Sequence, residues 1–76
     1  MIKRFAVFYP GESRVLAYVE STGIVRAGRI TRRFLREEVG GLMPFILVDA
    51  DEVRRGWHSR GAEEVYDNHN APTIPG

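Results

Sequence analysis

The sequence predicts a single small α+β domain with helices on one face of a mostly antiparallel sheet. The chain has 76 residues, enough for one domain and not for two. Short apolar segments alternate with turns that contain glycine and proline, which is typical of strands in a small sheet. The predicted order of elements is β-β-β-α-β-(α)-β. We expect the domain to span residues 1–67, followed by an extended or mobile tail over residues 68–76.

The first part of the chain predicts an antiparallel meander. Aromatic and β-branched side chains dominate residues 3–9, and the sequence of residues 14–20 is typical of a returning strand. Pro10 and Gly11 between them indicate a turn, because proline fixes φ and glycine accepts a positive φ. A second turn at residues 21–23 leads into a third expected strand over residues 24–30.

The third expected strand leads into a predicted helix over residues 32–39. Thr31 is a suitable N-cap, and the apolar Leu35 and Val39 are four residues apart. Gly40 then supplies the left-handed conformation that commonly ends a helix.

A second helix is predicted after the largely apolar segment of residues 44–48, which is itself typical of a buried strand. Asp49 is the expected cap of this helix, and Val53 and Trp57 are four residues apart on it. A short strand over residues 62–66 completes the domain. A helix between the third and fourth strands is also the order of a small OB-like barrel, which is the alternative fold.

The charge of the chain is divided unevenly. Residues 1–40 carry eight basic and four acidic side chains, a net of +4, whereas residues 41–76 carry three and six, a net of −3. Opposite halves of this kind could attract each other within one chain or between copies, which makes a homo-oligomer one alternative. Ten of the eleven basic residues are arginine. We favour a high-GC genome as the explanation over selection for bidentate contacts.

The strongest candidate for a partner-binding surface is an arginine-rich segment where the third strand meets the first helix. In the predicted helix, Arg32 and Arg33 fall in the first turn, where the helix macrodipole favours acidic side chains. Two glutamates, Glu37 and Glu38, fall in the last turn, where it favours basic side chains. Departures from a local rule often mark a functional constraint. A solvated helix face beside the acidic second half remains the simpler interpretation. The candidate residues are Arg26, Arg29, Arg32, Arg33 and Arg36.

Trp57 is a further candidate, either as an anchor at a protein interface or as a core residue packed with Val53.

A catalytic or metal-binding site has less support in the sequence. Cysteine is absent, and neither a nucleophile elbow nor a phosphate-binding loop occurs. The pair Asp49 and Asp51 is better explained by helix capping than by a divalent metal, and two histidines are too few for zinc. We therefore expect no enzyme activity, no cofactor and no metal.

These observations predict a small non-enzymatic protein-interaction module that binds a partner protein through its arginines. A compact, arginine-rich chain is typical of the small proteins that phages and mobile elements encode, and one form of this prediction is a regulator or inhibitor of that type that binds a host protein. The alternatives are a nucleic-acid-binding domain with the same arginines on phosphates, and a homo-oligomeric structural protein. No apolar run approaches the length of a membrane span, and no secretory leader is evident, so we expect a cytoplasmic location.

Overall fold

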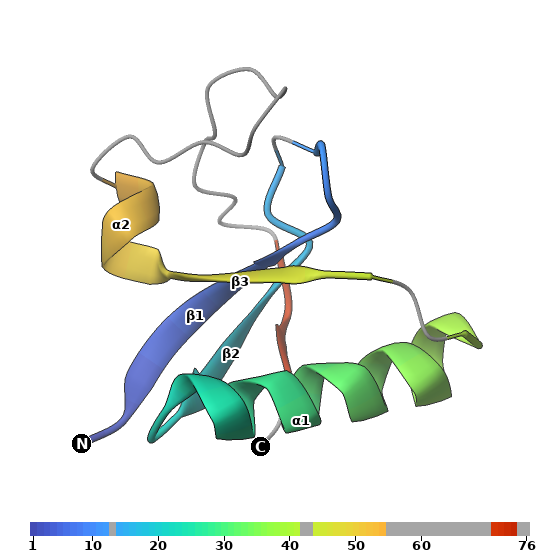
Figure 1. Ribbon diagram of the computed structural model, residues 1–76, viewed down its shortest axis with the longest axis horizontal. Helices are drawn as coiled ribbons and strands as arrows, with labels where there is room; N and C mark the ends of the chain where they lie inside the picture. Colours follow the sequence, from blue (N-terminus) through green and yellow to red (C-terminus); the bar gives the residue numbers. More distant parts are fainter. Residues whose placement is uncertain (13, 42–43, 55–70, 75–76) are drawn as a thin grey trace.

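The computed structural model of the chain describes residues 1–12, 14–41, 44–54 and 71–74. These residues form one α+β domain with a single sheet (Figure 1). Its elements in chain order are β1 (Lys3–Phe8), β2 (Ala17–Ser21), α1 (Ile24–Phe34), the π-helical turn η1 (Leu35–Val39), β3 (Ile46–Asp49), α2 (Ala50–Arg54) and β4 (Thr73–Ile74).

Four strands make up the sheet in the described part of the chain, in the order β3-β1-β2-β4. Strand β1 is antiparallel to β2, with Lys3 opposite Ser21 and Val7 opposite Ala17. It is also antiparallel to β3, whereas β2 and β4 are parallel. The sheet is therefore mixed and open. The OB-like barrel is wrong, and so is the strand order of the predicted meander.

The two faces of the sheet carry separate apolar clusters, because side chains alternate along a strand. Phe5 and Val7 of β1 lie in one cluster with Ala27 of α1. Ala6 and Phe8 lie in the other cluster, which includes Val53 of α2. The helices consequently cover opposite faces, on either side of the strands in Figure 1, and the expectation that both lie on one face is wrong.

Helix α1 is the largest departure from the sequence-based expectation. Residues 24–30, predicted as a strand, form its first two turns, and the helix continues through η1 to residue 39 (Figure 1). The β-branched side chains of this segment favour a strand locally. The tertiary structure favours a helix, because three fully buried residues recur at intervals of four on the side that faces the sheet. These residues are Ala27, Thr31 and Leu35.

Thr31 illustrates the same correction at the level of one side chain. It is buried in the middle of the helix instead of capping its start, and its hydroxyl donates a hydrogen bond of 2.8 Å to the carbonyl oxygen of Ala27. The residue at the N-cap position is Gly23, and it makes no side-chain cap. The predicted end is confirmed, because Gly40 has the left-handed φ of 81°.

The last described strand joins the C-terminal segment to the sheet. Within residues 68–76, Thr73 and Ile74 form β4 beside β2, and the Tyr18 amide donates a hydrogen bond of 2.8 Å to the Pro72 carbonyl. Ile74 is buried in the cluster under α1. The expected strand over residues 62–66 lies outside the described residues.

Two glycines provide a direct test of the helical assignment. Among the described residues, a Cβ at Gly28 meets only Leu47 Cδ1, at an ordinary contact distance of 3.8 Å. We expect Gly28→Ala to raise the free energy of unfolding by about 0.5–1 kcal/mol, the usual gain in a helix interior. Gly40→Ala should lower it by roughly 1–2 kcal/mol, because alanine at that positive φ is strained.

Urea unfolding of both variants and the wild type measures these changes. The two midpoints should move in opposite directions at an unchanged slope. A clear loss of stability in Gly28→Ala would contradict the position of this residue in an open helical turn.

Candidate functional site

Five arginine side chains share one exposed face of the α1–η1 helix. All five are exposed to solvent. With 3.6 residues per turn, their positions fall within roughly one third of the helix circumference. We call this surface the arginine face; its members are Arg26, Arg29, Arg32, Arg33 and Arg36.

The orientation of the arginine face follows from the buried side of the helix. Ala27, Thr31 and Leu35 are completely buried, which fixes the rotation of the helix about its own axis. Arg29 and Arg32 then point away from the sheet, because they lie on the other side of each turn. The sequence predicts the arginines as candidates, but the assignment of residues 24–30 to a strand divides them between two elements.

The charge arrangement along the helix also differs from the expectation. Because α1 begins at Ile24 and continues through η1 to residue 39, Arg32 and Arg33 lie in the middle of the helix, away from the N-terminal end where the macrodipole disfavours cations. The predicted misplacement of these two arginines at the start of a helix is therefore wrong. An unfavourable position does exist at Arg26, which lies in a first turn that contains no acidic residue.

Only one member of the arginine face is paired with a carboxylate in the described part of the chain. The Arg33 Nε donates a hydrogen bond of 3.2 Å to Glu37 Oε1, and the two side chains are 80% and 59% exposed. An ion pair this exposed contributes less than about 1 kcal/mol to stability and leaves the guanidinium largely accessible. Among the described residues, no salt bridge within 4.0 Å involves Arg26, Arg29, Arg32 or Arg36.

Apolar side chains lie exposed at the N-terminal end of the same helix. Val25 is 72% exposed and Ile24 is 55% exposed. Val25 precedes Arg29 by four residues and Arg32 by seven, so it lies within the arc of the arginine face. The predicted strand gave no reason to expect an exposed valine here. A helical periodicity count over residues 24–35 is the signal that could have found it.

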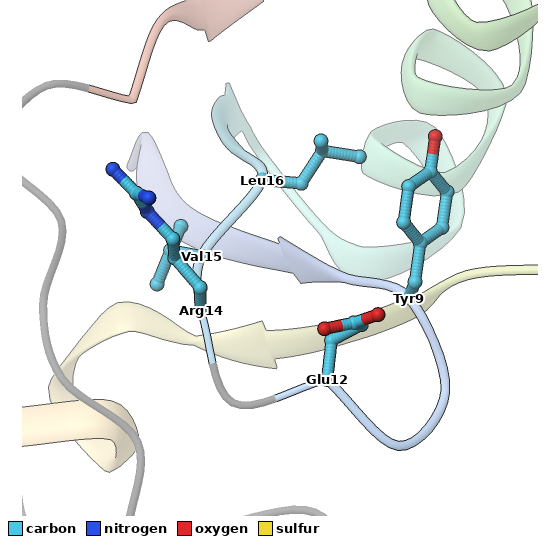
Figure 2. Close-up of a pocket in the computed structure, with 5 residues that line it drawn as sticks. All are labelled: Tyr9, Glu12, Arg14, Val15 and Leu16. Atoms are coloured by element: carbon cyan, nitrogen blue, oxygen red, sulfur yellow. The ribbon is translucent and has the colours of Figure 1, made fainter.

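A second surface feature is an open hollow of about 260 Å³ beside the loop between β1 and β2. The predicted turn is confirmed there: the Glu12 amide donates a hydrogen bond of 3.0 Å to the Tyr9 carbonyl, and Gly11 takes the positive φ that its position requires. Figure 2 shows the guanidinium of Arg14 pointing away from the phenol of Tyr9. The residues that line this hollow are Tyr9, Glu12, Arg14, Val15 and Leu16.

The remaining candidates lie at or beyond α2. The Asp51 amide donates a hydrogen bond of 2.9 Å to Asp49 Oδ1, which confirms Asp49 as the cap of α2. Trp57 lies outside the described residues. Within the described segments, no three side chains of the metal-binding types come together, and no helix is long and apolar enough to cross a membrane.

Comparisons with family models, with curated proteins and with solved structures give no match for this chain. Function is therefore inferred from the geometry of the arginine face.

The unfavourable position of Arg26 in the first turn of α1 can be tested by its effect on the free energy of unfolding. We expect Arg26→Glu to raise the free energy of unfolding by about 0.3–1 kcal/mol, because it places a carboxylate in the first turn of α1. Arg29→Glu, in the middle of the helix, should change it by less than about 0.5 kcal/mol. Urea unfolding at low and high salt measures both values, and salt should reduce the Arg26→Glu gain. A loss above about 1 kcal/mol in either variant would show that the arginine is held by the fold and is not a free surface group.

Proposed function

We propose that the chain is a small non-enzymatic interaction module that binds an acidic surface of a partner protein through the arginine face. The observation that carries the proposal is the alignment of five exposed arginines on one helix that packs on the sheet through buried residues. Guanidinium groups bind carboxylates in bidentate geometry, and arginine is enriched in protein interfaces while lysine is depleted. Binding of this kind suits a cytoplasmic regulator or inhibitor, which acts by occupying its partner.

A protein partner is favoured over a nucleic acid by what surrounds the arginines. The exposed Val25 lies among them, and an apolar side chain gains nothing from contact with phosphates. The exposed Glu37 and Glu38 follow Arg36 on the same helix and would repel a polyanion. The net charge of +1 is also low for a chain that tracks a phosphate backbone.

The proposal of a non-enzymatic role rests on the chemistry of the described surface. The hollow near Tyr9 is lined from the single loop between β1 and β2, and the guanidinium of Arg14 points away from the phenol of Tyr9 (Figure 2). General acid–base chemistry needs groups within hydrogen-bond reach of one reacting atom.

A selection of displayed peptides tests the proposed function for a partner of any sequence. We expect a random peptide library on phage, selected on the immobilised chain at physiological salt, to become enriched in aspartate and glutamate. The variant R29E/R32E should lose affinity for the selected peptides by about tenfold or more, because two attractive contacts become repulsive. The variant K3E/R14E is the matched control, since it changes the net charge equally at exposed positions outside the arginine face.

Two results would overturn the proposed function. One is a selection that shows no acidic enrichment, or acidic peptides that bind R29E/R32E as well as the wild type. The other is a DNA or RNA oligonucleotide that binds more tightly than the selected peptides at the same salt concentration, with the steep salt dependence of phosphate contacts.

A further inference from the structure

The spacing of residues on the exposed side of α1 follows the pattern of a helix–helix seam. Val25, Arg29, Arg32 and Arg36 are separated by four, three and four residues. This spacing lines up the residues that one helix presents to another in a coiled coil. With a rise of 1.5 Å per residue, the seam extends for about 16 Å, or three turns. Arg26 and Arg33, seven residues apart, flank it on one side.

The backbone of α1 offers this surface no other means of recognition. Beyond its first turn, the amide and carbonyl groups of α1 are engaged within the helix, so an extended peptide on this face has no strand edge to pair with. Side chains alone must make the contacts. A partner helix that crosses at about 20° keeps its side chains against a seam of this spacing over several turns.

From this geometry we infer that the arginine face binds an acidic α-helix of its partner, an inference that rests on the proposed function. Arginines occupy three of the four seam positions, and burying a guanidinium without a carboxylate is costly. The partner helix therefore carries glutamate or aspartate at three consecutive seam positions. An apolar residue of the partner faces Val25, at the fourth position.

The end of the helix limits where the acidic stretch can lie. Glu37 and Glu38 are exposed just beyond Arg36. Like charges placed opposite each other oppose binding, so the acidic residues of the partner end at Arg36. Along the α1–η1 helix, the partner helix is thus apolar opposite Val25, acidic over the next two turns, and free of acidic residues beyond Arg36.

Designed peptides test this inference on the full chain. The seam peptide is a fluorescein-labelled, alanine-rich helical peptide with one leucine and three glutamates at spacings of four, three and four. It is made in two versions, with the leucine at either the N-terminal or the C-terminal end of this pattern. A control peptide of identical composition distributes the same glutamates around the helix. We expect one direction of the seam peptide to bind at least ten times more tightly than the control peptide in fluorescence anisotropy. The variant R29E/R32E should lose the preference for the seam peptide over the control peptide, whereas K3E/R14E should keep it. A seam peptide with lysine in place of glutamate should bind R29E/R32E.

Each other outcome contradicts the inference in a distinguishable way. If seam and control peptides bind equally, or if neither binds while displayed acidic peptides do, the partner is not a helix and the proposed function still holds. If displayed acidic peptides also fail, or if a duplex oligonucleotide displaces the seam peptide at equal concentration, both proposals are wrong.

Discussion

The packing of α1 on the sheet is the contact on which the rest of the structure depends. Ala27, Thr31 and Leu35 are completely buried on the side of the helix that faces the strands. The small side chain of Ala27 and the hydroxyl of Thr31, bonded inside the helix, allow a close approach of the two layers. Because this packing fixes the rotation of the helix, it also turns the arginine face outward. One apolar contact therefore stabilises the domain and orients the surface that we propose for binding.

Where local sequence and tertiary structure agree, the fold could be predicted. The segments around β1 and β3 are strands because their apolar, strand-favouring side chains are also required by the core. The turn at Gly11, the C-cap at Gly40 and the cap at Asp49 depend on the local chemistry of one or two residues. The arginines could also be identified as candidates, because their number and spacing are visible in the sequence without the fold.

The remaining features depend on contacts between distant segments, and local patterns do not contain them. Ile24, Val25 and Ile30 favour a strand, and only the sheet beneath α1 decides for a helix. The parallel pairing of β2 with β4 joins residues more than 50 positions apart, for which two residues of strand give no sequence signal. The common face of the arginines and the exposure of Val25 follow from the helix, so they were missed together with it.

The conformation of residues 24–30 is therefore the most direct test of the central claim that one continuous helix carries the arginine face. Backbone NMR assignment of the full chain measures it through the secondary shifts of the Cα carbons. The structure predicts helical shifts from Ile24 onward without a break at Thr31, and slow amide exchange at Ala27, Thr31 and Leu35. Extended shifts over residues 24–30, with helical shifts beginning only after Thr31, would contradict it and divide the arginines between two elements.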